Sequence, residues 1–313
     1  MAALNILVYI SSLVTIWVGA NLIVDSIDRF SKKLRLSTFS VSFFVLGLLT
    51  SIPEIAVGAN SVGEGKAEIF VGNLIGGIAV LFLFVVPVIA IVGNGIKISH
   101  HLSNKILISS FVVMLIPTFF VLDKRVTNFE GLLMILSYAI LFYFVQRNHG
   151  VLDHGELRAL EAKNFSTVDI FKVLLGVILV FIASQNLVDK TIYLAELMRI
   201  PLYYVSLILL SVGTNIPELS LGLSAVHAHK KDVAFGDYVG SACANTIIFG
   251  VLTLVNDGEV LTVNNFLPTF IILTTGLAIF FVFTKSKQDI SRKEGYMLLG
   301  FYAIFSLIEL LTK

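Results

Sequence analysis

The chain has little charge for its length. Of its 313 residues only 14% are Asp, Glu, Lys or Arg, and 57% are hydrophobic, whereas soluble domains carry about 25% charged residues. The mean hydropathy is +0.92. These values exclude a soluble enzyme and a disordered protein. The 22 Lys and Arg nearly balance the 21 Asp and Glu, so no nucleic-acid partner is expected.

Cysteine is almost absent as well. The single cysteine, Cys243, excludes an intramolecular disulfide and a metal site built from cysteines. The apolar segments also contain no cluster of Cys and His, no paired nucleophile and base, and no phosphate-binding loop. We therefore expect neither an enzyme nor a resident cofactor.

Long apolar runs are what the chain has in excess. A helix needs about 20 mostly apolar residues to cross the roughly 30 Å hydrocarbon core of a bilayer. The first run has neither the basic flank nor the cleavage site of a signal peptide, so we expect it to be retained. The sequence predicts ten spans, at residues 4–24, 38–61, 68–93, 105–122, 128–146, 168–189, 202–226, 233–255, 262–283 and 293–311.

The positive residues of the loops predict the orientation. Alternate loops collect 16 Lys and Arg on one side and 6 on the other, and the richer side is normally cytoplasmic. Both termini are then extracytoplasmic, in what we expect to be a prokaryotic plasma membrane. The longest polar connector, 147–167, is expected to be a cytoplasmic linker.

One motif occurs twice. Thr-Ser-Ile-Pro-Glu ends at Glu54 and Thr-Asn-Ile-Pro-Glu ends at Glu218, 164 residues later. With five spans in each half, the second copy enters the membrane from the opposite face, as in the inverted repeats of secondary transporters. The predicted fold is an all-α membrane protein of ten transmembrane helices in two inverted five-helix repeats. The repeats are 1–146 and 168–313, joined by 147–167 into one membrane domain.

The repeated motif gathers oxygen atoms on one helical face. Glu54 follows Thr50 by four residues and Ser51 by three, and such residues are neighbours on a helix. Pro53 has no N–H, so the helix is expected to break there, which at membrane depth requires a cavity or protein surroundings. Thr214, Asn215, Pro217 and Glu218 repeat the pattern. Two facing copies would offer hard oxygen ligands, which suit Ca²⁺.

Several residues near the motifs have two interpretations. The hydroxyls of Thr50 and Thr214 are either ion ligands or bonded back to their own helices. Asp237 is either a helix cap or a proton-linked carboxyl. The glycine rows after each motif, which allow backbones to approach closely, are expected to serve packing: Gly72, Gly76 and Gly77, then Gly236 and Gly240.

With these motifs the chain resembles the calcium/cation antiporter superfamily, most closely the prokaryotic sodium/calcium exchangers. The resemblance covers essentially the whole chain. It implies alternating access around four cation positions near the midplane, with one Ca²⁺ exchanged for several Na⁺. The ligands that it implies are the side chains of Glu54, Glu218, Thr50, Thr214, Ser51, Asn215, Ser241 and Asn245, and the backbone oxygens of Gly47 and Ser211.

Three positions depart from the family pattern. Gly77 replaces a small hydroxyl residue, and Leu81 and Asn245 replace a polar pair of Asn and Asp. The site therefore keeps two carboxylates instead of three. The assignment of Ca²⁺ as the substrate is accordingly better supported than that of Na⁺ as the coupling ion.

We predict a secondary antiporter that exchanges Ca²⁺ for Na⁺ across the bilayer, with the cations bound between the two repeats. Two alternatives stay open. One is a proton-coupled exchanger of Ca²⁺ or another cation, and the other is a non-transporting membrane scaffold with a degraded site. The expected partners are Ca²⁺, Na⁺ or H⁺, and lipid; the sequence predicts no oligomeric state.

Overall fold

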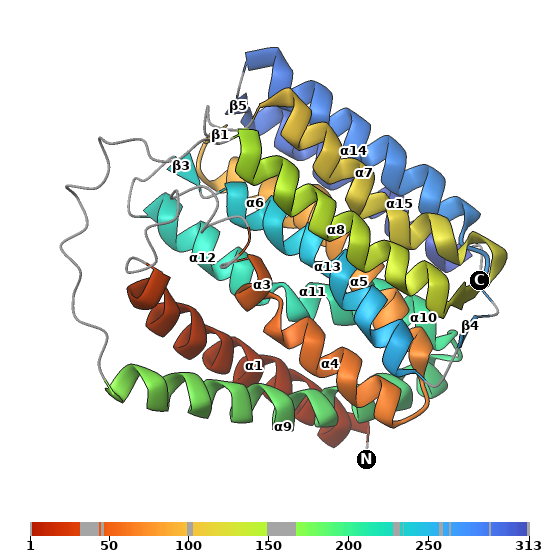
Figure 1. The fold of residues 1–313 in the computed structure, drawn as a ribbon. Coiled ribbons are helices and arrows are strands. Elements are labelled where there is room, and N and C mark those ends of the chain that lie inside the picture. Colours follow the sequence, from red (N-terminus) through yellow and green to blue (C-terminus); the bar gives the residue numbers. More distant parts are fainter. Residues whose placement is uncertain are drawn as a thin grey trace.

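Helices make up almost all of the fold (Figure 1). The computed structural model describes residues 2–31, 44, 47–98, 103–148, 167–227, 232–233, 235–256, 259–262, 264–287 and 289–311. The first half contains α1 (Ala2–Ser31), α3 (Gly47–Thr50), α4 (Ile52–Gly63), α5 (Ala67–Val80), η2 (Leu81–Val85), α6 (Val86–Val92), β1 (Ile96–Ile98), α7 (Asn104–Phe120), η3 (Val121–Asp123), β2 (Arg125–Thr127) and α8 (Asn128–Asn148). The second half contains α9 (Thr167–Met198), α10 (Leu202–Val205), η5 (Ser206–Leu210), α11 (Ser211–Thr214), α12 (Ile216–His227), β3 (Asp232–Val233), α13 (Phe235–Val255), β4 (Glu259–Leu261), α14 (Leu267–Lys287), β5 (Asp289–Ile290) and α15 (Arg292–Leu311).

The predicted all-α membrane fold is confirmed. Within the described residues, nine helical segments are long and apolar enough to cross a membrane. The remaining predicted span, 38–61, is described at Phe44 and from Gly47 onward. The linker predicted at 147–167 lies almost entirely outside the described residues.

The largest error in a predicted boundary lies at the end of the sixth span. The span expected at 168–189 belongs to a helix, α9, that continues to Met198. Lys190 and Glu196 lower the hydropathy of this last part, but Glu196 is exposed and a helix end can carry such charges at the membrane surface. The end predicted from hydropathy therefore lies nine residues before the end of the helix.

Short strands mark the two ends of the bundle. At one end β1 pairs parallel with β3 and antiparallel with β5, and we call this the sheet end. At the other, β2 pairs antiparallel with β4, and Arg125 forms an ion pair with Glu259 across the pair. We call this the hairpin end. Of the loops whose positive charge predicts a cytoplasmic location, the described parts that contain β1, with Lys97, and β5 lie at the sheet end; the orientation itself stays a prediction.

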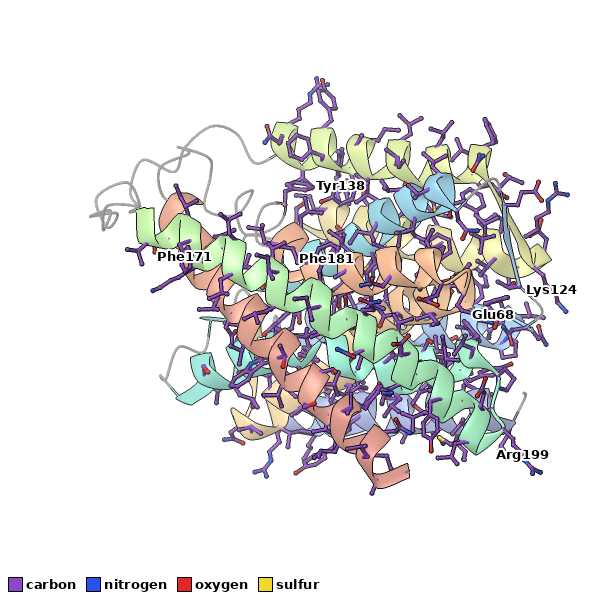
Figure 2. All side chains as sticks on the ribbon, turned by 90° about the horizontal axis from the view of Figure 1, so that it is seen from below. Glu68, Lys124, Tyr138, Phe171, Phe181 and Arg199 are labelled. Atoms are coloured by element: carbon purple, nitrogen blue, oxygen red, sulfur yellow. The ribbon has the colours of Figure 1, made fainter. Side chains whose placement is uncertain are left out.

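Helices α1 and α9 form a pair on one side of the bundle (Figure 1). They cross at two glycines, because a Cβ atom at Gly19 would lie 2.9 Å from the carbonyl oxygen of Gly176. Their outer faces are apolar, and Phe171 and Phe181 on α9 are exposed (Figure 2). In a bilayer these faces contact lipid.

Helices α5 and α13 lie at the centre, where nearly every residue is buried. Glycines let the halves touch there. A Cβ atom at Gly76 would overlap the carbonyl oxygen of Leu207, and one at Gly47 would lie 2.5 Å from the carbonyl carbon of Gly240. The predicted packing role of the glycine rows is confirmed for Gly76 and Gly240.

A π-helical segment, η5, precedes the second motif directly. Phe44 is also π-helical and lies 164 residues before Ile208 in η5, so the two copies agree. Such wide turns are frequent at functional sites. The π turn brings the backbone of Leu207 against Gly76 and so positions the motif that follows.

The close approach at Gly76 predicts a stability change. Gly76→Ala forces α5 away from η5, and we expect overpacking to cost about 1–3 kcal/mol. The protein purified in detergent should therefore lose thermal stability, measured as its melting temperature. Gly300→Ala is the matched control, because no atom lies within 4 Å of a Cβ at that position. Equal melting temperatures for both variants would contradict the packing assignment.

Candidate cation site

Both motifs fold as broken helices. The first breaks at Ser51 (φ −82°, ψ 7°), between α3 and α4, and the second breaks at Asn215 (φ −93°, ψ 11°), between α11 and α12. The predicted interruption is therefore confirmed in both copies. Glu54 and Glu218 consequently lie in the first turns of α4 and α12, where the helix dipole favours a negative charge.

The two carboxylates are buried and largely without partners. Glu54 is 1% exposed and Glu218 0%. Among the described residues, neither oxygen of Glu218 nor Oε2 of Glu54 has a hydrogen-bond partner. Oε1 of Glu54 accepts only a long bond, 3.5 Å, from the amide of Asn215. The two carboxylates also lie within electrostatic range of each other. Buried anions are costly unless they are paired, so this arrangement suits a cation.

The threonines of each copy face the glutamate of the other. Thr214 lies beside the Glu54 carboxylate and Thr50 beside that of Glu218. Both hydroxyls also bond back to their own helices, to the carbonyl of Gly47 at 3.2 Å and that of Ser211 at 3.3 Å. The back-bonded interpretation therefore holds for Thr50. The single proton of the Thr214 hydroxyl is shared between the Ser211 carbonyl and Oδ1 of Asn73, which lies 3.1 Å away. The ligand role of both threonines stays a prediction.

The residues at the two helix breaks are held differently. Ser51 donates to the Gly47 carbonyl at 2.8 Å and shares a 3.1 Å hydrogen bond with Ser241 of α13. Asn215 donates instead to the Ser211 carbonyl at 2.8 Å. The two carbonyls expected to bind cations thus accept side-chain donors in this structure. The hydrogen bond between Ser51 and Ser241 therefore joins the broken helix of the first repeat to α13 of the second.

Amide groups fill the space where the family has a hydroxyl. A Cβ atom at Gly77 would lie 2.9 Å from Nδ2 of Asn245 and 3.4 Å from Nδ2 of Asn215. Asn245 donates to the Leu74 carbonyl at 3.1 Å, and its own oxygen has no partner among the described residues. Leu81 is buried and begins η2. Two amides thus compensate for part of the lost polarity.

Sequence reasoning missed two buried polar groups. Asn73 on α5 is fully buried and accepts a 3.1 Å bond from Thr214; its only signal was that it aligns with Asp237 in the repeat. Glu309 on α15 is fully buried near the hydrogen-bonded pair of Tyr203 and Thr269. Its position near the end of a span concealed it, because an acid there is normally assigned to the membrane surface.

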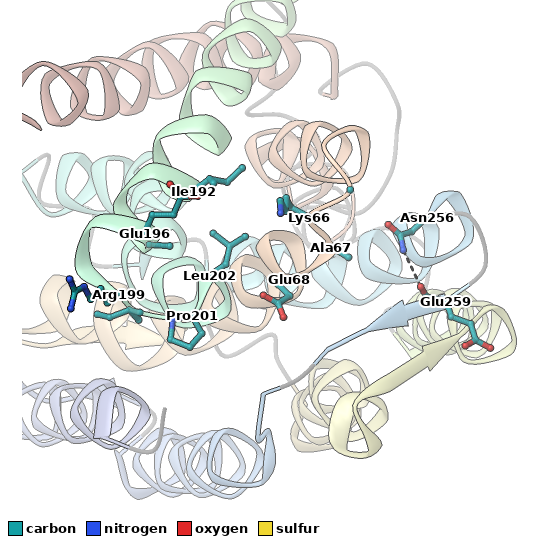
Figure 3. Close-up of a pocket in the computed structure, with 13 residues that line it drawn as sticks. Lys66, Ala67, Glu68, Ile192, Glu196, Arg199, Pro201, Leu202, Asn256 and Glu259 are labelled. Carbon is teal, nitrogen blue, oxygen red and sulfur yellow. Dashed lines mark hydrogen bonds between the residues drawn. The ribbon is translucent and has the colours of Figure 1, made fainter. Parts of the chain in front are cut away.

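A separate cavity of 720 Å³ lies at the hairpin end (Figure 3). Its lining mixes basic and acidic side chains, among them Lys66, Arg199, Glu68 and Glu196. Figure 2 shows Glu68, Lys124 and Arg199 at this same end. None of the predicted ligands lines the cavity, so it is distinct from the buried carboxylates.

The chain is similar to known exchangers over nearly its full length. The sodium/calcium exchanger of Methanosarcina acetivorans is 24% identical and covers 98% of this chain and 99% of its own. An uncharacterized membrane protein of Methanocaldococcus jannaschii is 25% identical, with 97% of each chain covered.

Solved structures show the same fold. An H⁺/Ca²⁺ exchanger superposes with a TM-score of 0.76 at 13% identity, covering 98% of this chain and 86% of that one. A sodium-calcium exchanger soaked with Na⁺ and Sr²⁺ gives 0.69 at 20% identity, covering 97% and 98%. The family described as "Sodium/calcium exchanger protein" matches residues 4–146 and 169–311, one segment in each repeat. The chain therefore belongs to the sodium/calcium exchanger family of membrane antiporters.

Proposed function

We propose that this protein exchanges Ca²⁺ for Na⁺ across the membrane, with the ions bound in turn between Glu54 and Glu218. The observation that carries the proposal is a set of three buried carboxylate oxygens, contributed by both repeats, that have no hydrogen-bond partner in the part of the chain that the structure describes. A scaffold without transport would have no reason to keep such a costly pair of charges.

The surrounding groups favour Ca²⁺ over a transition metal. The hydroxyls of Thr50 and Thr214 lie beside the carboxylates, and the amide oxygen of Asn245 has no partner among the described residues. Hydroxyl and amide oxygens are hard donors. Two carboxylates balance the charge of one Ca²⁺. Ca²⁺ and Na⁺ are transported ions in this scheme and not resident cofactors.

Exchange requires no covalent chemistry. A bound ion shifts the equilibrium between the two access states only through its different affinity for each. Ca²⁺ and the driving ion compete for the same carboxylates, so the site returns loaded with the other ion. Broken helices suit such a site, because non-helical backbone at membrane depth is tolerated where it lines a cavity, and secondary transporters bind ions at such breaks.

The proposed setting is a prokaryotic plasma membrane with both termini outside. The sheet end then faces the cytoplasm, since the loops rich in Lys and Arg lie there. An inward Na⁺ gradient would drive Ca²⁺ out of the cell.

Proton coupling is the second candidate, and one residue favours it. Asn245 stands where the family commonly has an acid, so the centre holds two carboxylates. Two protons neutralise such a pair as completely as one Ca²⁺ does, whereas three Na⁺ would leave an excess positive charge without a third acid.

Removing either central charge should abolish exchange. We expect Glu54→Gln and Glu218→Gln each to reduce ⁴⁵Ca²⁺ flux into proteoliposomes to background, because a single carboxylate no longer balances a divalent ion. Glu64→Gln is the control, since Glu64 is exposed just after α4. Flux at the wild-type rate in both site variants would refute the assigned site. Absence of Ca²⁺ binding by the purified wild-type protein would instead support the scaffold alternative.

The coupling ion is tested by imposing the gradients separately. We expect an outward Na⁺ gradient at uniform pH to drive ⁴⁵Ca²⁺ uptake into vesicles loaded with Na⁺. A pH gradient in Na⁺-free vesicles should give only background uptake. Uptake driven by the pH gradient alone would reject Na⁺ coupling in favour of proton exchange, and would leave the two-carboxylate site intact.

The amides beside Gly77 predict an energetic coupling. Gly77→Ser places its Cβ against the Asn245 amide, and we expect the displaced amide to weaken Ca²⁺ binding about tenfold, measured by titration calorimetry. In an Asn245→Ala background the same substitution should cost less, because the obstructing amide is gone. A double-mutant cycle should give a coupling of about 0.5–3 kcal/mol; additive effects would show that the two positions act independently.

A further inference from the structure

Asp237 is a buried carboxyl that the central pair does not explain. It lies in the first turn of α13 and is 7% exposed, and its Oδ1 has no hydrogen-bond partner among the described residues. Its charge lies within electrostatic range of the Glu218 carboxylate. The neighbouring Tyr238 donates a 3.3 Å hydrogen bond to the Glu218 carbonyl, so α13 is fixed against the start of α12.

The position of Asp237 along the bundle follows from the helices. α12 runs from the central break toward the sheet end, where β3 follows it, and α13 begins after β3 (Figure 1). Asp237 is therefore on the sheet-end side of Glu218. Its Oδ1, which no described residue pairs, is therefore a buried oxygen between the central carboxylates and that end.

The repeat supplies a neutral counterpart. Asn73 precedes Asp237 by 164 residues, lies on α5, and is fully buried. α5 begins at the hairpin end, so Asn73 lies on that side of the centre, beside Thr214 at 3.1 Å. These two symmetric positions thus differ by one charge: an amide stands on one side of the centre and a carboxylate on the other.

We propose that Asp237 and Glu218 form a cation subsite on the sheet-end side of the central pair, which a divalent cation occupies on its way between that end and the centre. The subsite has no equivalent on the hairpin-end side, where Asn73 is neutral. The proposal rests on the proposed exchange function and adds to it a difference between the two faces of the membrane. Both carboxylates have oxygens without a hydrogen-bond partner among the described residues, Oδ1 of Asp237 and both oxygens of Glu218.

A purely structural role for Asp237 makes a different prediction. A carboxylate in a first helical turn is stabilised by the helix dipole, and this role needs no cation. Removing the charge would then lower stability and leave the Ca²⁺ affinity the same at both faces. The proposed subsite instead predicts a change in affinity at one face.

The test compares Ca²⁺ affinity at the two faces. Right-side-out and inside-out membrane vesicles present opposite ends of the protein, and the KM of ⁴⁵Ca²⁺ transport is measured in each for wild type, Asp237→Asn and Asn73→Asp. We expect Asp237→Asn to raise the KM about tenfold at the face that exposes the sheet end, because one charge near a divalent ion is missing. The other face should keep the wild-type KM.

Asn73→Asp is the matched variant, because it adds the charge at the symmetric position. It should lower the KM at the opposite face, and it keeps the idea testable if Asp237→Asn folds poorly. Equal changes at both faces, or none at either, would overturn the subsite. Absence of Ca²⁺ flux in wild-type vesicles would overturn the exchange function and the subsite together. Normal flux, with the same KM as wild type at each face in both variants, would overturn the subsite alone.

Discussion

The structure depends on one electrostatic constraint: two carboxylates, Glu54 and Glu218, are buried in the middle of an apolar bundle, and the described residues offer them almost no hydrogen-bond donors. Their charge is tolerable only when a cation or protons balance it. A cation that must be held by two halves of a chain also requires the halves to meet at that position. Ion binding and the docking of the repeats are therefore one problem.

Small residues and helix breaks solve that problem together. Without a side chain, Gly76 lets α5 touch the π turn at Leu207, and Gly47 lets α3 touch α13. Each contact joins one repeat to the other. The breaks at Ser51 and Asn215 then start new helices whose first turns carry the glutamates. Close backbone contact and broken helices would each be a defect alone, and combined they bring the carboxylates within range of each other.

The sequence predicts the parts of this arrangement that depend on local rules. Apolar run length identifies the spans, proline identifies the breaks, and the Thr-x-Ile-Pro-Glu duplication predicts the candidate site. It fails where tertiary packing decides. The amides of Asn215 and Asn245 converge on Gly77 only because two elements of the second repeat meet α5 of the first repeat there, and no local spacing encodes that. The burial of Glu309 was missed for the opposite reason. Its place near a helix end indicated an exposed side chain, but packing buries it.

The departures from repeat symmetry carry a physical consequence of their own. In a perfectly symmetric inverted repeat the two faces of the membrane would meet identical chemistry, and ion affinity would be the same from each side. Here Ser51 is paired with Asn215, Gly77 with Ser241, and Asn73 with Asp237. Such differences cannot bias the net direction of exchange, because the ion gradients set it. They can set the concentration at which each face fills, which is the property a transporter needs when the ion is scarce on one side and abundant on the other.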